Sequence, residues 1–418
     1  MPPLRLVAPL AVMALAPLVA ASGARAQTRT TRAPLPHPAG RYAVGTEVLH
    51  VVDSSRATSR SIHTRPLTVQ AWYPAQRGTG TDDVRYVERA LLDSMMSARY
   101  LDLDSAAMRG WADVRVDARS RATSATPPSA RGWPVVVLSH GMGVARANYT
   151  AIAEELASHG YVVLAVDHPI GGFTLAPGGR VLRPGIDSLH YPDHPLASIV
   201  RDWAIDDALV VRRATMLLGH GGGGVARVVL DTSRVAAIGH SLGGAAALQA
   251  CLAQPLFDAC ADMDGAVFGD VETERIGKPI LVLLSEPDHA DRPPPRDSAE
   301  AARRERFAQM GRERDSTWTA ICARQGDAPC YVAKLTGTGH FSFSDAPFQI
   351  PSELQGVGAT LTPAAMHRAM ADRLLTFLGA TIRVSASSTR CGSPRSPARG
   401  RGGSASPRDR DDRLSCAR

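Results

Sequence analysis

The chain has 418 residues, enough for one large domain or two ordinary ones, and its 44% apolar content can form a substantial core. Its formal net charge is +7, but the excess lies at the ends: residues 1–26 hold two arginines, and residues 384–418 hold eight arginines against three aspartates. Because the body between them is formally neutral, the charge argues against a nucleic-acid-binding face.

The first 26 residues show the three-part pattern of a secretory signal peptide. One arginine precedes an apolar run over residues 6–21, and Ala24, Arg25 and Ala26 form a small-x-small cleavage site. No stop-transfer segment follows, so we expect cleavage near Ala26, no transmembrane anchor afterwards, and a secreted or periplasmic protein.

Apolar runs then follow at spacings that suit crossover helices. The first two, residues 46–52 and 67–74, are expected to form an antiparallel pair. The later runs, typical of strands buried on both faces of a sheet, are 135–141, 161–169, 234–241, 257–265, 279–286 and 330–340. Helical patterns cover 148–160, 197–219, 242–254 and 363–379. This alternation predicts an α/β fold over residues 27–383, with a mostly parallel, doubly wound sheet and helices on both faces.

Two stretches interrupt the alternation. Residues 82–132 hold a short helical pattern at 86–96 and then a connector rich in Arg, Ser and Pro, and residues 288–317 are highly charged. Both are candidates for lids over a site at the strand ends, and solvated surface insertions are an equally good interpretation. Residues 384–418, rich in Ser, Arg, Pro and Gly, are expected to form a disordered tail.

All six cysteines follow the signal peptide, in a compartment that permits disulfides. Short separations suggest two local bridges, Cys251–Cys260 and Cys322–Cys330, although six cysteines allow fifteen pairings and the sequence does not choose among them. No CxxC or His/Cys cluster with zinc-ligand spacing is present, so we expect no metal site and no cofactor.

The segment Gly239-His240-Ser241-Leu242-Gly243 lies between an apolar strand and a helical pattern. A serine between glycines often does no more than form a turn. Between a strand and a helix, however, Gly-x-Ser-x-Gly forms a tight elbow that exposes the serine at the carboxyl edge of the sheet. We therefore predict that Ser241 is a nucleophile. His240 is expected to point away from the site and pack.

A serine hydroxyl needs a base to accept its proton, and a carboxylate to orient that base. Downstream of Ser241, the available histidines are His289, His340 and His367. His340 directly follows the last predicted strand, whereas His289 lies in a charged loop and His367 in an amphipathic helix. This placement favours His340 as the base.

Spacing alone does not decide the acid. Asp264 ends the strand after the elbow helix, and Asp288 follows the next strand, which leaves the two nearly equal. Asp262 and Glu286 are weaker candidates, because strand alternation places Asp262 deeper in the sheet and Glu286 is expected to be solvated.

An oxyanion hole needs two backbone N–H groups, one from the residue after the nucleophile and one from a loop after an earlier strand. Leu242 supplies the first, and Met142, in a glycine-flanked turn, is the candidate for the second. His140, Trp72 and Phe341 are candidates for lining the substrate pocket, with packing or structural hydrogen bonding as the competing interpretation.

Several motifs, taken in order, resemble the secreted platelet-activating-factor acetylhydrolase-like (isoform II type) family of α/β-hydrolase esterases. They are WYP at 72–74, LSHGMG at 138–143, AVDHP at 165–169, GHSLGG at 239–244, DMDG at 262–265 and GHFSFSD at 339–345. The resemblance covers residues 42–379 and implies the α/β-hydrolase fold, with a nucleophile, base and oxyanion donors at the positions already named. That family places the acid directly after the strand that follows the elbow, so the resemblance favours Asp264 over Asp288.

The sequence thus predicts an exported serine hydrolase that cleaves carboxylic esters through an acyl-enzyme. Its expected partner is a small-molecule or lipid ester, such as a short-chain or phospholipid acetyl ester. The charged stretch 288–317 and the Arg-rich tail depart from the family and leave the substrate open. The alternatives are another hydrolase of this fold, acting on polyester, dienelactone or amide bonds, and a non-catalytic binding protein of the same fold. Surface adhesion through the basic tail is the least favoured.

Overall fold

The computed structural model describes most of the chain. The described residues are 33–59, 62–98, 108–185, 195–221, 226–287, 295, 297–350 and 359–382. The described residues belong to one compact unit. The expected signal peptide and tail, together with Asp288 and His289, lie outside the described residues.

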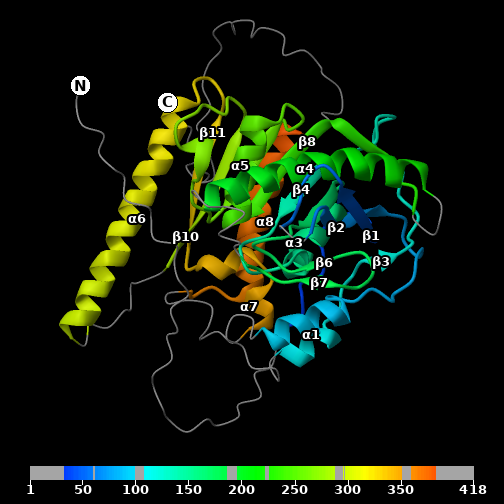
Figure 1. Cartoon of the computed structure of the whole chain (residues 1–418), viewed down its shortest axis with the longest axis horizontal. Coiled ribbons are helices and arrows are strands. Elements are labelled where there is room, and N and C mark those ends of the chain that lie inside the picture. Colours follow the sequence, from blue (N-terminus) through cyan, green and yellow to red (C-terminus); the bar gives the residue numbers. More distant parts are fainter. Residues whose placement is uncertain are drawn as a thin grey trace, which may run out of the picture. The chain divides into compact units, whose positions relative to one another are not determined.

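A nine-stranded sheet, in the order β11-β10-β9-β8-β4-β5-β2-β1-β3, forms the centre of this unit (Figure 1). Its parallel part consists of β4 (Trp133–Ser139), β5 (Val162–Asp167), β8 (Leu230–His240), β9 (Ala259–Met263), β10 (Ile280–Glu286) and β11 (Cys330–Thr336). The strands β1 (Ala43–Asp53) and β2 (Arg65–Ala75) pair antiparallel, and β2 joins β5 antiparallel. The predicted mostly parallel sheet and its antiparallel opening pair are therefore confirmed.

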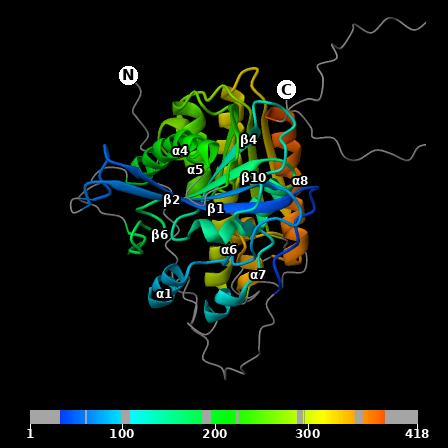
Figure 2. The same ribbon diagram turned by 90° about the vertical axis from the view of Figure 1, so that its right-hand side faces the viewer.

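Helices cover both faces of the sheet, as predicted. Their bounds are α1 Arg89–Ser97, α3 Thr150–Ser158, α4 Pro195–His220, α5 Leu242–Ala253, α6 Ser298–Arg324, α7 Ala346–Gln349 and α8 Pro363–Thr381. Figure 2 shows α4 and α5 on one side of the sheet and α8 on the other. Minor elements are β3 (Arg119–Ser120), the pair β6 (Thr174–Leu175) and β7 (Val181–Leu182), and the 3₁₀ turns η2 (Gly110–Asp113), η3 (Arg146–Tyr149), η4 (Gly269–Glu272) and η5 (His340–Phe343).

Alternate residues of the central strands enter two separate cores. On β4, Val135 and Val137 pack in the apolar cluster that contains residues of α4 and α5. Their neighbours Val136 and Leu138 pack in the cluster that contains residues of α3 and α8. Because successive side chains of a strand point to opposite faces, a strand covered on both faces must be apolar throughout. This explains the uninterrupted apolar runs in the sequence.

The described part of the stretch at residues 82–132 contributes side chains to the core. Tyr86, Leu91 and Trp111 are all buried in the core cluster shared with α3 and α8. The helical pattern at 86–96 corresponds to α1. The described part of this stretch therefore packs as an integral layer of the domain.

Residues 298–317 of the charged stretch belong to the 27-residue helix α6, which the apolar patterns do not predict. Asp297 caps the helix by accepting a hydrogen bond from the Glu300 amide. Trp318 and Ile321 anchor the helix in the same core cluster as residues of α4 and α5, and ten of its 27 residues are charged. The acidic cap with Glu three residues later is a sequence signal for this helix start.

One of the two suggested disulfides is present. Cys322 at the end of α6 is bonded to Cys330 at the start of β11, eight residues later. Cys251 on α5 and Cys260 on β9 are free, buried thiols, so the suggested second bridge is wrong. Both lie within the apolar cluster, where an unoxidised cysteine packs as a small apolar side chain.

The Cys322–Cys330 bridge gives a test of how the end of α6 is fastened to the sheet. Replacing both residues (Cys322→Ser and Cys330→Ser) should lower the free energy of unfolding by about 2–3 kcal/mol, because the unfolded chain loses the constraint of a short closed loop. Urea denaturation of the two proteins measures the difference. Reducing agent should shift the wild-type curve and leave the double-variant curve in place; coincident curves for wild type and variant would contradict this.

Candidate active site

Ser241 is the single residue between the end of β8 and the start of α5. Its φ of 56° and ψ of −123° place it in backbone conformations that non-glycine residues rarely adopt. This strained strand-to-helix turn is the geometry of a nucleophile elbow, which lifts the serine hydroxyl above the sheet edge.

The two glycines of the motif are required by close backbone contacts. A Cβ atom added at Gly239 would lie 2.1 Å from the carbonyl oxygen of Gly243. One added at Gly243 would lie 2.2 Å from the carbonyl oxygen of Ser139 at the end of β4. Since real Cβ atoms essentially never approach backbone this closely, only glycine fits at either position.

The hydroxyl of Ser241 lies within hydrogen-bond distance of His340, which in turn contacts Asp264. Ser241 Oγ is 3.1 Å from Nε2 of His340, and Nδ1 of His340 is 2.8 Å from Oδ2 of Asp264. Because an ionised carboxylate only accepts, Nδ1 carries the proton and Nε2 is free to accept one from Ser241. The structure thus brings together three residues that sequence analysis singled out from three separate strand ends.

Asp264 is a buried carboxylate with several donors. Its Oδ1 accepts from the Ser285 amide at 2.7 Å and from Arg314 Nη1 at 3.2 Å, and its Oδ2 accepts from the Ser285 hydroxyl at 2.8 Å. Burial acts to raise the pKa of Asp264, but the hydrogen bond and charge of His340, the Ser285 amide and the Arg314 guanidinium together lower it to about 2. The group is therefore ionised at neutral pH.

Ser285 and Arg314 are site residues that sequence analysis missed. Ser285 lies near the end of β10, which pairs with β9, and Asp264 directly follows β9, so strand order could have suggested Ser285. Arg314 lies in the middle of α6, and its Nη2 also donates to the Ser285 carbonyl oxygen at 3.1 Å. The contact of Arg314 with Asp264 depends on where α6 packs, and no local sequence pattern predicts the position of that helix.

The other acidic candidates lie elsewhere. Asp262 is fully buried, accepts from the Gly265 amide, and has a pKa that burial raises well above its usual value. Glu286 accepts from the Thr336 hydroxyl at 2.5 Å. Asp288 is outside the described residues. Within the described chain, Asp264 is thus the carboxylate that contacts His340.

The two candidate oxyanion donors come from the first turn of α5 and from the loop after β4. Leu242 is the first residue of α5, so its N–H is one of those that a helix leaves without an internal acceptor. Met142 lies in the loop that follows β4, and its neighbour Gly141 approaches the nucleophile so closely that an added Cβ would lie 3.3 Å from Ser241 Cβ. Among the described residues, no backbone acceptor is found for the Met142 amide.

His140 does not line a substrate pocket. It lies in the interior and hydrogen-bonds to the loop after β4. It is fully buried, its Nδ1 donates to the Gly141 carbonyl oxygen at 2.7 Å, and its Nε2 accepts from the His168 amide at 3.1 Å. Burial, with the charge of His168, lowers the pKa of His140 to about 3, so the ring is neutral. Gly143 N–H donates to Gly171 O at 2.5 Å and fixes the far side of the loop.

The two aromatic candidates have different outcomes. Trp72 is fully buried on β2, in the core beside α3, and β4 and β5 separate that strand from β8, so it does not wall the site. Phe341 directly follows the base, is partly buried, and its ring centre lies 5.8 Å from that of His340. Only Phe341 is adjacent to the reacting groups.

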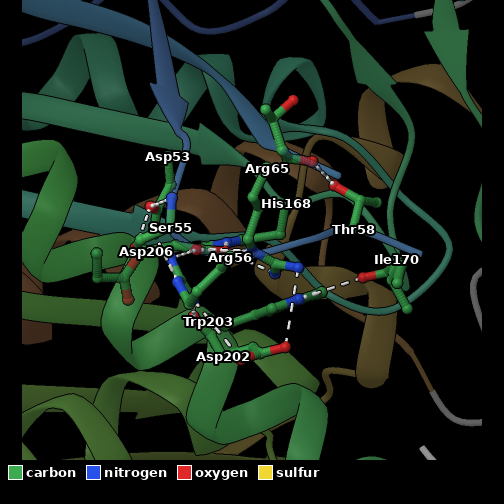
Figure 3. Close-up of polar contacts among 12 residues, drawn as sticks. Asp53, Ser55, Arg56, Thr58, Arg65, His168, Ile170, Asp202, Trp203 and Asp206 are labelled. Carbon is green, nitrogen blue, oxygen red and sulfur yellow. Dashed lines mark hydrogen bonds and ion pairs between the residues drawn. The ribbon is translucent and has the colours of Figure 1, made fainter. Parts of the chain in front are cut away.

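A buried ionic network underlies the loop after β4 and connects the β1–β2 hairpin to α4 (Figure 3). Arg65 Nε and Nη2 donate to the two carboxylate oxygens of Asp206 at 2.8 and 2.7 Å. His168 Nδ1 lies 3.0 Å from Asp206, and its ring stacks on Trp203 with centres 4.4 Å apart. Arg56 also donates to Asp206. The Arg65 charge thus compensates a carboxylate that has no access to water.

This network contains a second serine–histidine–aspartate sequence of contacts. Ser139 Oγ lies 2.9 Å from His168 Nε2 and 2.9 Å from Asp207, and His168 contacts Asp206. All four side chains are fully buried, so no substrate reaches the Ser139 hydroxyl. The arrangement is structural.

Breaking this network should destabilise the domain. Asp206→Asn removes the carboxylate that hydrogen-bonds to the buried Arg65 and leaves it the more distant Asp202, 3.9 Å away, so we expect the free energy of unfolding to fall by about 3–5 kcal/mol. Urea denaturation measures the change. Asp270→Asn is the matched control, because Asp270 pairs with Arg201 at the surface, where an ion pair contributes at most about 1 kcal/mol. Equal losses in the two variants would contradict the expectation.

Comparisons with known proteins agree with the fold. A solved structure described as a ferulic acid esterase from Streptomyces cinnamoneus superposes with a TM-score of 0.62, at 27% identity, over 87% of this chain and 97% of that one. The sequence model of the dienelactone hydrolase family matches residues 120–308. Together with the elbow and the sheet order, these findings define the protein as an α/β-hydrolase.

Within that class, the chain is similar to platelet-activating-factor acetylhydrolases, as its motifs predict. The family model described as platelet-activating factor acetylhydrolase, isoform II, matches residues 28–169. A probable 1-alkyl-2-acetylglycerophosphocholine esterase of Arthroderma benhamiae is 26% identical over 58% of this chain and 62% of its own length. The platelet-activating factor acetylhydrolase of Canis lupus familiaris is 26% identical over 37% of this chain and 40% of its own length. The matches thus span less than two thirds of these relatives.

Proposed function

We propose that this protein is a secreted serine esterase that hydrolyses carboxylic esters through an acyl-enzyme. The observation that carries the proposal is the continuous contact from the Ser241 hydroxyl through the His340 ring to the buried Asp264 carboxylate. The family resemblance and the esterase names of the relatives support the same reaction. Within the described part of the chain, no helix is long and apolar enough to cross a membrane.

The first half of the reaction acylates the serine. His340 Nε2 accepts the hydroxyl proton as Ser241 Oγ attacks the ester carbonyl carbon, and the negative charge that forms on the carbonyl oxygen is stabilised by the Met142 and Leu242 amides. Asp264 stabilises the imidazolium cation through its contact with Nδ1. His340 then gives the proton to the departing alcohol, and the ester C–O bond breaks.

The second half releases the acid. Water takes the place of the alcohol, His340 removes one of its protons, and the resulting hydroxide attacks the acyl-enzyme carbonyl. The intermediate collapses, the proton returns to Ser241 Oγ, and the carboxylic acid leaves. No cofactor takes part in these reaction steps. A pure binding protein of this fold would have no need for a strained serine in contact with a histidine and a buried carboxylate.

For the substrate, we propose short acyl esters, with acetyl esters of lipid alcohols first. This follows the names of the relatives, several of which are platelet-activating factor acetylhydrolases. An ester of an aromatic acid is the second candidate, favoured by the esterase structure that matches over nearly its whole length.

The nucleophile can be tested by activity and by labelling. Ser241→Ala should reduce kcat by about 10⁴-fold or more, because no other group on this turn can attack the ester. The assay uses the mature chain with p-nitrophenyl esters of increasing acyl length, a 2-acetyl phospholipid and methyl ferulate, and we expect the highest kcat/KM with acetyl esters. A serine-reactive phosphonate should label Ser241; labelling of another residue, or full activity of the variant, would refute the assignment.

The acid can be tested by a matched pair of substitutions. Asp264→Asn keeps the shape of the side chain but removes the charge that fixes the His340 tautomer, so kcat should fall by about 10⁴-fold. Asp288→Asn is the control from the neighbouring strand end and should keep wild-type kcat. The opposite pattern would assign the acid to Asp288 and overturn this part of the proposal.

A further inference from the structure

His240, the residue before the nucleophile, makes two directed hydrogen bonds that the reaction as described does not use. It is 3% exposed, its Nδ1 lies 2.8 Å from the Tyr149 hydroxyl, and its Nε2 lies 2.9 Å from the carbonyl oxygen of His340. A carbonyl oxygen only accepts, so Nε2 carries the proton. Nδ1 is therefore the acceptor, and Tyr149 is the donor.

Tyr149 extends this chain to the loop after β4. It is fully buried at the end of η3, and its hydroxyl oxygen accepts the Gly141 N–H at 2.9 Å. Since the hydroxyl proton is committed to His240, each bond in the chain has one direction. Gly141 donates to Tyr149, Tyr149 donates to His240, and His240 donates to the His340 carbonyl.

The two ends of this chain are parts of the proposed active site. Gly141 directly precedes Met142, whose amide is the second oxyanion donor, and the other end is the backbone of the base itself. The chain passes behind Ser241 through the last residue of β8. It therefore joins the loop after β4, the turn η3, the elbow and the turn η5.

The surroundings of His240 favour its neutral form. Burial, and next the nearby charge of His340, lower the pKa of His240 to about 3. The two rings are close, with centres 4.6 Å apart, so a second cation there would oppose formation of the His340 imidazolium. Phe343 packs beside the His240 ring, with centres 6.1 Å apart, but an apolar contact holds a ring in place without selecting which nitrogen donates.

We propose that Tyr149 and His240 are positioning residues for ester hydrolysis: their hydrogen-bond chain holds the Met142 amide and the His340 ring in the mutual placement that the transition state needs around Ser241. This inference rests on the proposed function. An oxyanion donor and a base accelerate the reaction fully only when both are correctly placed. Weakening this hydrogen-bond chain therefore lowers the rate of the chemical step more than it weakens substrate binding.

The test is a double-mutant cycle on the full chain. Tyr149→Phe removes only the hydroxyl and leaves Gly141 N–H and His240 Nδ1 without partners; His240→Asn keeps an acceptor for Tyr149 and loses the bond to the His340 carbonyl. We expect each single variant to lower kcat about 10- to 100-fold with KM within about twofold of wild type. Because both act through one chain, the double variant should lose much less than the product of the two single losses.

Tyr73→Phe is the matched control. Tyr73 is also fully buried, and its hydroxyl donates to the Ala122 carbonyl oxygen at 2.8 Å, in the β1–β2 region remote from Ser241. It should lose stability to a similar extent, measured by thermal unfolding, and keep wild-type kcat. The rate of phosphonate labelling at Ser241 provides an independent readout and should fall in the Tyr149 and His240 variants only.

The possible outcomes separate this inference from the proposed function. The positioning role is refuted if Tyr149→Phe and His240→Asn keep the kcat of the Tyr73→Phe control, or if their effects on kcat multiply independently. In either case, ester hydrolysis by the wild type would still support the proposed function. If one variant does not fold, the other single variant still decides by its kcat and KM. Ester hydrolysis that survives Ser241→Ala would refute the proposed function itself.

Discussion

The site depends on the close contact between the first turn of α5 and the end of β4. Gly243 lies so near the Ser139 and His140 carbonyl oxygens that a Cβ atom would meet them at 2.2 and 2.4 Å. This contact presses the loop after β4 against the elbow. The strain at Ser241 is held by packing on both faces of the sheet.

The buried carboxylates near the carboxyl edge of the sheet need compensating charges, because they are removed from water. Asp264 and Asp206 are both carboxylates removed from water, and each is held ionised by an arginine and a histidine together. His140 and His240 are buried without a carboxylate partner, so burial keeps them neutral and available as fixed donors and acceptors. Of the histidines around Ser241, His340 is the one with an exposed side chain, 44% accessible, and a carboxylate behind it. That difference in environment separates the ring proposed to transfer protons from the rings proposed to position loops.

Sequence patterns predicted the layers well because they report local physics. Strands buried on both faces must be apolar, and the glycines of the elbow are required by contacts within a few residues of one turn, apart from the approach of β4. The same patterns failed where the answer depended on distant packing. α6 is charged and carries few core residues, Trp72 and His140 are aromatic rings near motifs but lie beneath the surface, and Cys251 and Cys260 are close in sequence yet pack as free thiols.

The sequence by itself determined the strand–elbow–helix at Ser241, the candidacy of His340 at a strand end, and an α/β fold to hold them, since each follows from side-chain periodicity or from the steric demands of a short turn. Tertiary structure decided which carboxylate meets His340. Spacing left Asp264 and Asp288 nearly equal, with Asp262 and Glu286 as weaker candidates. Among the described residues, Asp264 contacts the ring because β9 lies between β8 and β10, and Ser285 of β10 and Arg314 of α6 donate to it. The sequence also could not predict the Tyr149–His240 hydrogen-bond chain. His240 lies 91 positions from Tyr149 and 100 positions from His340, and no local sequence rule relates residues so far apart.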